Sequence, residues 1–194
     1  MQPDTALSVE AAIRERRSIR SYAPRAVDRA TVRTLLDAAV RAPTAVHLEP
    51  WAFVVVQNAR LLREISDLAK PLFVAEAQRA HLDRGGHTLE KFRQPEFNIF
   101  YDAGTLIIVC AETEGPFVAA DCWLAAENLM LAACSMGLGT CVIGSALAAL
   151  NLAEVKARLG IPEGFSVVAP IIVGVPAGST PASPRKEPRI LAWK

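Results

Sequence analysis

The chain has 194 residues, of which 52% are hydrophobic, and its 21 basic and 20 acidic side chains leave a formal net charge of +1 at pH 7. This near-neutral balance argues against a general nucleic-acid or anionic-membrane binder, so any positive potential must come from local clusters. The chain can bury one core, no apolar run approaches the roughly 18 residues of a membrane span, and Met1 is not followed by a signal-peptide pattern, so we expect a single cytoplasmic domain over residues 1–194.

Two helices are predicted before residue 42. Ser8 is a candidate N-cap, and an apolar stripe that also carries Arg16 follows at helical spacing: Val9, Ala12 and Ile13. We therefore expect Arg16 on the side that faces the core, where a charge needs a partner. Asp28 opens the second helix, Pro43 ends it, and its apolar face comprises Val32, Leu35, Leu36, Ala39 and Val40.

A strand over residues 51–56 and a helix over residues 60–69 are predicted next. The strand is apolar throughout, which is typical of burial on both faces in the middle of a sheet. Pro71 is expected to end the helix. Residues 72–100 are more polar and irregular, and we interpret them as a surface excursion, because connections of this length are usually functional or mobile.

The second half of the chain begins with a strand over residues 106–111. Asp121 is a candidate cap for a helix that runs to Met136 and is apolar on nearly all sides, so we expect this helix to be buried within the domain or against a second subunit. Gly137 ends it, and residues 137–144 turn into another short strand.

The last elements are a helix, a strand and a tail. Asn151 and Glu154 resemble a capping box for a helix that ends at Leu159, and a strand follows over residues 167–173. The tail over residues 177–194 contains three prolines and cannot form its own core, so it must lie on another surface. Because the connections are uneven in length, we expect an α+β sandwich with a mixed sheet of four or five strands.

The four cysteines lie in apolar stretches without Cys-x-x-Cys spacing: Cys110, Cys122, Cys134 and Cys141. We expect buried, reduced thiols and no metal site. The histidines show no metal-ligand spacing, and no hydrolytic triad is evident. Residues 137–144 are rich in glycine, but they follow a helix and miss the Gly-x-Gly-x-x-Gly spacing, which argues against a dinucleotide-binding loop.

A basic cluster near the start is the first candidate site. Arg16, Arg17, Ser18 and Arg20 bring three guanidinium groups and a hydroxyl together within five residues. One interpretation is a solvated helix end, where cations are favourable. The other is an anion site, because this combination suits a doubly charged phosphate.

A loop between two prolines, Pro43 and Pro50, is the second candidate site, and it leads directly into the strand at residue 51. His47 can donate a hydrogen bond. Glu49 cannot replace the donor half of an amide, so near a ligand it must be paired or protonated. Alternatively, the two are an ordinary loop histidine and a surface carboxylate.

These segments, with the central apolar helix and the basic tail, resemble the nitroreductase-like flavoprotein family. The signature of that family is an arginine-rich phosphate motif followed by a Pro-Ser-x-x-Asn-x-Gln-Pro-Trp loop. This sequence has Thr44, His47 and Glu49 where the family has serine, asparagine and glutamine. The resemblance implies an α/β/α sandwich, bound FMN and an intertwined homodimer in which the tail packs on the partner.

The resemblance also implies roles for particular residues. Arg16, Arg17 and Ser18 correspond to residues that hold the FMN phosphate and ribityl chain, and Arg20 to one that reaches the pyrimidine edge of the ring. A segment along the ring near N5 corresponds to Val142, Ile143, Gly144 and Ser145. The loop that contacts the FMN of the neighbouring subunit corresponds to Pro43, Thr44, Ala45 and His47. Arg185 is a candidate second phosphate ligand, or else a tail charge in solvent.

The implied activity is FMN-dependent oxidoreduction. NAD(P)H would reduce the flavin, and a nitroaromatic or quinone would take the electrons in a ping-pong cycle over a ring bordered in part by residues 72–100. No side chain need act as an acid or base. Two alternatives stay open: specialised flavin chemistry of the same family (dehalogenation, flavin cleavage or azoline oxidation), and a flavin-binding module without turnover.

Overall fold

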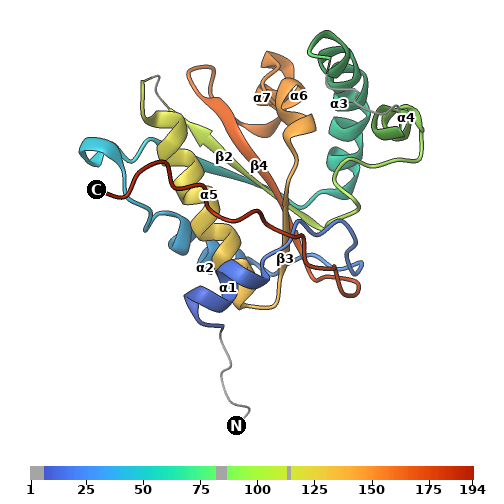
Figure 1. The fold of residues 1–194 in the computed structure, drawn as a ribbon. Helices are drawn as coiled ribbons and strands as arrows, with labels where there is room; N and C mark the ends of the chain where they lie inside the picture. Colours follow the sequence, from blue (N-terminus) through green and yellow to red (C-terminus); the bar gives the residue numbers. More distant parts are fainter. Residues whose placement is uncertain (1–6, 82–86, 113–114) are drawn as a thin grey trace.

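The computed structural model of the protein describes residues 7–81, 87–112 and 115–194. At its centre lies a four-stranded sheet with the order β1-β2-β4-β3 (Figure 1), formed by β1 (Trp51–Val56), β2 (Thr105–Ala111), β3 (Gly139–Val142) and β4 (Ser166–Gly174). The predicted α+β class and strand number are confirmed. The sheet is not mixed, however, because each strand pair is antiparallel; a parallel contact occurs at the isolated bridge between Ser18 and Thr140.

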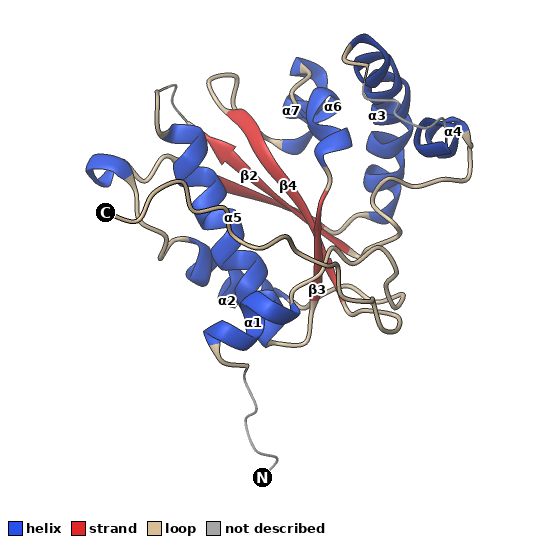
Figure 2. Ribbon diagram, viewed as in Figure 1, coloured by secondary structure: helices blue, strands red, loops and turns tan. Residues whose placement is uncertain are grey.

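Helices cover both faces of the sheet, which confirms the predicted sandwich (Figure 2). One face carries α2 (Arg29–Ala39) and α5 (Val118–Ser135), with α1 (Val9–Glu15) packed on α5. The other face carries α3 (Ala59–Arg79), α6 (Leu147–Leu150) and α7 (Ala153–Leu159), with α4 (His87–Arg93) against α3. Two short 3₁₀ helices, η1 (Ala45–His47) and η2 (Gly144–Ala146), lie in connecting segments.

The central strand β2 explains why this sheet needs two helical layers. Its side chains alternate, so that Leu106, Ile108 and Cys110 join the core under α3 and α6, while Ile107, Val109 and Ala111 join the core under α2 and α5. All seven residues of β2 are buried. An unbroken apolar run is the pattern that burial on both faces requires.

The first strand does not occupy the predicted central position. β1 forms one edge of the sheet and pairs only with β2 among the described strands. Val55 is 38% exposed, and most other residues of β1 are half-buried. The apolar run therefore predicted the strand correctly but not its position in the sheet. An edge strand has the same apolar composition when another segment of protein covers it.

The N-terminal segment after α1 lies along β3 and β4. The amide of Ile19 donates to the carbonyl of Thr140 at 2.9 Å, and Tyr22 bridges to Pro176. This close approach requires glycine in both strands, because a Cβ on Gly139 would come within 2.7 Å of Ile19 and one on Gly174 within 2.7 Å of Tyr22. The packing holds residues 18–22 at a fixed position beside the end of β3.

Helix α3 continues past Pro71, contrary to the expectation that it ends there. The proline removes one intrahelical hydrogen bond, but Ala69 and Ala77 on either side of it are both buried, and this packing outweighs the loss. Residues 82–86 of the predicted surface excursion lie outside the described part of the chain, and the rest of residues 72–100 is less irregular than predicted. This remainder includes the end of α3 and all of α4, and the stretch closes with Phe97, Ile99 and Phe100 in the core.

Two predicted helix caps serve other purposes. Asp121 lies in the first turn of α5, which begins at Val118, and its carboxylate accepts a hydrogen bond from the amide of Ala45 at 3.3 Å. Asn151 does not cap α7; it accepts from the amide of Val167 at 2.8 Å and donates to the carbonyl of the same residue at 3.1 Å. Both side chains could cap a helix, but each hydrogen-bonds instead to a backbone group that is distant in the sequence.

One side of the α1 and α5 layer is apolar and exposed in the single chain. Ala12 faces the core, but Val9 and Ile13 are 72% and 60% exposed, so the stripe on α1 does not point inward as predicted. Trp123 and Leu124 expose more than two fifths of their surface on α5, so this helix is not buried all round within one chain. No helix among the described residues is long and apolar enough to cross a membrane.

The tail over residues 177–194 contains no helix or strand, and all of its residues are exposed. Its apolar side chains include Ile190, Leu191 and Trp193. The tail forms no core of its own, as the sequence predicts.

Candidate functional site

A hollow of about 350 Å³ lies beside the end of β3, on the face of the sheet that carries α3. It brings together residues that are far apart in the sequence: Arg20, Phe73, Phe92, Ile99, Tyr101, Cys141, Val142, Ile143, Gly144 and Ser145. Two of the sequence-predicted groups, Arg20 and residues 142–145, therefore share one cavity. Its volume is within the usual range for small-molecule sites.

The fold positions these groups through backbone contacts. Arg20 belongs to the segment that the Ile19 amide fixes against Thr140, immediately before the hollow-lining residues of β3. The amide of Ile143 donates to the carbonyl of Pro170 at 2.8 Å, which holds the turn from β3 into η2. The cation and the turn are thus anchored to the same two strands.

Arg20 is the main cation of this hollow. Its side chain is exposed, and it forms no ion pair with any acidic group in the described part of the chain. Burial raises the pKa of Tyr101 and of Cys141 above their usual values, and the nearby Arg20 charge opposes both shifts. The guanidinium therefore faces a thiol and a phenol that stay neutral, and it is available to a negatively charged group.

Three of the residues that line the hollow are aromatic: Phe73, Phe92 and Tyr101. The ring of Phe92 lies 4.6 Å from that of Phe73 and 5.3 Å from that of Phe97, and Phe97 stands edge-on to Tyr101 at 5.6 Å. The Nζ atom of Lys91 lies 4.6 Å from the centre of the Phe97 ring. We call Phe73, Phe92, Phe97 and Tyr101 the aromatic wall. Such a wall suits a planar ligand that can stack on or against its rings.

The remaining residues of the basic cluster lie at the end of α1. Arg16 is the residue after α1, and its Nε is 3.3 Å from a carboxylate oxygen of Glu127 on α5. Arg17 donates to the backbone carbonyls of Arg14 and Arg16, and Ser18 pairs with Thr140. Arg16 thus finds the partner that its charge needs, a carboxylate, within this chain. Ser18 lies two residues before Arg20, in the segment that runs beside β3.

The proline loop lies at the start of α5 and not at the hollow. The amide of Ala45 is held by Asp121, Thr44 accepts a hydrogen bond from the amide of Glu49 at 3.4 Å, and the side chain of His47 is exposed. Val46, His47 and Glu49 all have φ between 46° and 55°, a left-handed backbone that is costly for residues with side chains. The structure does not bring Pro43, Thr44, Ala45 or His47 together with Arg20.

Arg185 lies in the exposed tail, and the described residues offer it no ion pair. The structure therefore leaves it apart from Arg16, Arg17 and Ser18. Its predicted role depends on where the tail lies in an assembled protein.

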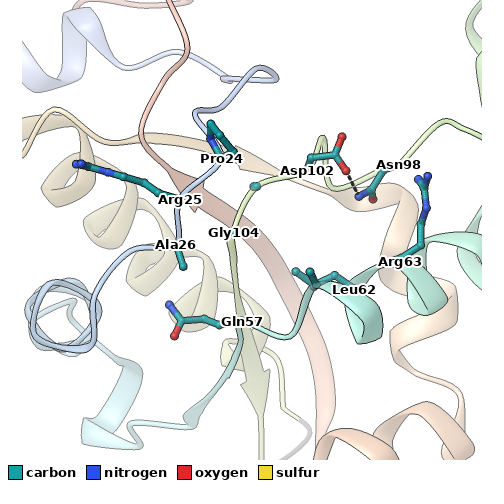
Figure 3. A pocket seen from close by; sticks show the side chains of 11 residues that line it. Pro24, Arg25, Ala26, Gln57, Leu62, Arg63, Asn98, Asp102 and Gly104 are labelled. Atoms are coloured by element: carbon teal, nitrogen blue, oxygen red, sulfur yellow. Dashed lines mark hydrogen bonds between the residues drawn. The ribbon is translucent and has the colours of Figure 1, made fainter.

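A second hollow of about 370 Å³ is lined in part by Asn98 and by residues 102–104 (Figure 3). Arg25, Gln57 and Arg63 line it together with Asn98 and Asp102, which are joined by a hydrogen bond of 2.8 Å. The nitrogen of the Gln57 amide donates to Val27 and Thr105 and is fully used by the fold. None of the sequence-predicted site residues lies in this second hollow.

The aromatic wall was missed as a set of site residues. A helix that ends at Pro71 would not include Phe73, so this ring is not expected on the same helix as the residues before it. The sequence predicts only that residues 72–100 border the site in part. Tyr101 gave no periodic signal because it lies in a turn with φ of 52°. All four cysteines are free; Cys110, Cys122 and Cys141 are buried as expected, whereas Cys134 is only partly buried. No cluster of metal-ligating side chains is found among the described residues.

Comparison with known proteins settles the family. Residues 13–175 match the model of the nitroreductase family. The chain belongs to this family. The match begins within α1 and ends just after β4, so it includes Arg20, the aromatic wall and residues 142–145, and it leaves out the tail.

Several nitroreductase-family proteins are similar over most of their length. A protein of Methanothermobacter thermautotrophicus, provisionally named NADH dehydrogenase/NAD(P)H nitroreductase, is 30% identical over 88% of this chain and 78% of its own. The crystal structure of a nitroreductase with bound FMN from Bacteroides fragilis covers 97% of this chain and 100% of its own, with 28% identity and a TM-score of 0.81. The iodotyrosine deiodinase of Thermotoga neapolitana is 25% identical over 78% of this chain and 80% of its own.

Proposed function

We propose that the protein is an FMN-dependent oxidoreductase that takes hydride from NAD(P)H and reduces a small acceptor such as a nitroaromatic or a quinone. One observation carries the proposal: Arg20, a guanidinium without a carboxylate partner among the described residues, lines a hollow together with the aromatic rings of Phe73, Phe92 and Tyr101. The family match and the FMN-containing relative from Bacteroides fragilis support it.

The residues of the hollow fit a flavin. A flavin ring is planar and apolar over much of its surface, and its pyrimidine edge gathers negative charge when it is reduced. Arg20 supplies a cation for that edge, and residues 142–145 supply a backbone turn along the ring. When bound, FMN supplies the chemistry of hydride acceptance and electron donation in two separate half-reactions.

The phosphate would be held by the basic cluster. Arg17 and Ser18 lie next to Arg20 on the segment fixed against β3, and Arg16 would have to share its charge between a phosphate and Glu127. A charge-assisted contact from guanidinium to phosphate is strong enough to compete with an ion pair whose carboxylate is 46% exposed. Arg185 would join them from the tail.

The assembly that we propose is a homodimer. The exposed apolar side chains on α1 and α5, the half-buried edge strand β1 and the extended tail all need covering surface. The proline loop, with Pro43, Thr44, Ala45 and His47, would reach the flavin of the partner, since it does not reach the hollow of its own chain. The cytoplasmic location stays a prediction from the sequence.

A second candidate is a specialised member of the family. The relative from Thermotoga neapolitana is named as an iodotyrosine deiodinase, and this chain departs from the family loop at His47 and Glu49. Under this alternative, FMN would bind but the protein would not turn over simple nitroaromatics with NADH or NADPH.

The test begins with the absorption spectrum of the purified protein and with turnover of nitrofurazone by NADH and by NADPH. We expect a yellow protein, bleaching of the bound flavin by at least one nicotinamide, and turnover with the same donor. Arg20→Met should slow the reaction about tenfold to a hundredfold, because it removes the cation from the developing charge. Arg25→Met, in the second hollow, is the matched control and should stay within about twofold.

Three results would contradict the proposal in different ways. A colourless protein that does not bind added FMN rejects the cofactor. Bound flavin that neither nicotinamide bleaches favours a module without turnover. Bleaching without reduction of nitrofurazone or a quinone favours the specialised enzyme.

A further inference from the structure

A buried lysine stands behind the aromatic wall, and the roles proposed above do not use it. Lys70 on α3 is 7% exposed, and its Nζ atom donates to the carbonyls of Phe97 at 3.0 Å, Pro95 at 3.1 Å and Gln94 at 3.3 Å. A carboxylate oxygen of Asp67 lies 2.8 Å away. An ammonium has three donors, so these acceptors satisfy it fully and offset the cost of burying its charge.

The three carbonyls come from one short stretch of chain. Residues 94–97 connect the end of α4 to the turn at residues 98–101, and this connection has no helix or strand to hold it. Two local hydrogen bonds, from Gln94 to Lys91 and from Phe97 to Gln94, are 3.3 and 3.2 Å long. Arg63 on α3 also donates to the carbonyl of Glu96 at 3.0 Å, but Lys70 contacts three carbonyls of this stretch and is buried, so it provides most of the hydrogen bonds that fix the stretch to α3.

The stretch in turn determines where the aromatic wall stands. Phe97 is 8% exposed, and its ring lies between those of Phe92 and Tyr101, in edge contact with both. Phe92 and Tyr101 line the hollow, although Phe97 itself does not. A shift of the backbone at residue 97 would move both rings relative to Arg20.

We propose that Lys70 is a positioning residue for the electron acceptor: it clamps residues 94–97 to α3 and so holds the aromatic wall along the space where a planar acceptor stacks on the flavin ring. The assignment rests on the proposed function, because it takes the hollow as the place of the flavin and the aromatic wall as a border of the space over its ring. Lys70 touches no reacting group and acts only through Phe97, Phe92 and Tyr101.

The principal test compares Lys70→Met, which keeps the length of the side chain and removes its charge and donors, with the unaltered protein. We expect KM for nitrofurazone to rise at least about tenfold, because small misplacements of binding groups are costly. The rate with ferricyanide, a compact oxidant that does not stack on rings, should change less than about twofold. A merely structural lysine would lower both activities together or neither.

Two variants serve as controls. Lys156→Met removes a similar contact on α7, where Nζ donates to the carbonyl of Glu163 at 2.6 Å, and it should leave both activities unchanged. Lys70→Arg keeps the charge and the donors and should restore most of the nitrofurazone affinity. If Lys70→Met does not fold, Lys70→Gln, which keeps one donor group, takes its place in the same comparison.

A double-mutant cycle tests whether Lys70 acts through Phe97. Phe97→Leu alone should also raise KM for nitrofurazone. In the double variant, Lys70→Met with Phe97→Leu, KM should stay within about twofold of the higher of the two single-variant values. Independent, multiplied effects would overturn the proposed path. An unchanged KM in both single variants would overturn the assignment itself.

A measurement without flavin or substrate separates this inference from the proposed function. Hydrogen exchange of the backbone amides at residues 97–101 should be at least about tenfold faster in Lys70→Met than in the unaltered protein, whether or not FMN is bound. Unchanged exchange contradicts the clamp even if the enzyme activity is as proposed. Faster exchange in a protein that never binds FMN supports the clamp and rejects only the function.

Discussion

At the scale of single residues, polar side chains make tertiary contacts that the sequence pattern does not predict. Asn151 ties β4 to the end of α6, and the buried Lys70 ties the segment after α4 to α3. Each side chain is satisfied by backbone groups that are distant in sequence. Removal of one such partner leaves a buried donor or acceptor without a hydrogen bond, which is more costly than losing an exposed contact.

The buried thiols give a prediction about alkaline pH. Burial raises the pKa of Cys110 and that of Cys122 from 9.0 to about 11. The folded state therefore keeps these protons at a pH where the unfolded state releases them, so the stabilisation is complete below pH 9 and is lost between pH 9 and pH 11. Thermal unfolding across this range should show a falling melting temperature.

The control for this prediction is the double variant Cys110→Ala, Cys122→Ala, in which the fall above pH 9 should be shallower. Iodoacetamide at neutral pH should leave both thiols of the folded protein unmodified. An equal pH dependence in the variant would assign the effect to other titrating groups.

At the scale of secondary-structure elements, the strands follow from the sequence better than the helix boundaries do. Residues 106–111 and 167–173 are predicted nearly to their limits, because apolar runs of that length between polar turns fit few alternatives. Helix α3 extends eight residues beyond Pro71, since the sequence alone does not reveal that Ala77 is packed against the core. The cap at Asp121 is misplaced for the same reason.

The contact between α5 and the proline loop gives a prediction at this scale. Asp121 is 4% exposed and accepts the amide of Ala45 with both carboxylate oxygens at 3.3 Å. Asp121→Ala leaves this amide without its partner and should lower the free energy of unfolding by about 1–3 kcal/mol. Urea unfolding measures the loss, and hydrogen exchange at Ala45 should become faster.

Asp121→Asn is the matched variant, because its side-chain carbonyl can still accept the hydrogen bond. We expect it to keep most of the stability. If the alanine and asparagine variants unfold at the same urea concentration, the contact does not hold the loop.

At the scale of the whole molecule, the sequence predicts the sandwich and half of the candidate site. Arg20 and residues 142–145 meet in one hollow, although they lie far apart in the chain. The proline loop and Arg185 do not join them, because their proposed places depend on a second copy of the chain. The hydrophobic periodicity of a sequence does not predict a contact between two copies of the chain, so only the family resemblance indicates this one.

The predicted dimer can be tested through the tail. Light scattering after size-exclusion chromatography should give twice the mass of one chain at micromolar concentration. Deletion of residues 177–194 should raise the dimer dissociation constant at least about tenfold, because the tail would no longer cover the partner. Trp193→Ala is a milder variant and should have a smaller effect in the same direction.

Two results would count against this assembly. A full-length protein that runs as a monomer at this concentration would remove the explanation for Val9, Ile13, Trp123 and Leu124 at the surface. A truncated protein with unchanged affinity would show that the tail lies elsewhere.

The pairing of residues 18–22 with β3 and the segment after β4 also bears on protein synthesis. Arg20 leaves the ribosome long before the strands against which its segment lies, because those strands follow it at a great distance in the sequence. The nascent chain must therefore keep this basic, partly apolar segment unpaired until β3 and β4 have been made. A site assembled from segments so far apart forms only after both strands have been translated, and a chain terminated before them would have no place to bind its cofactor.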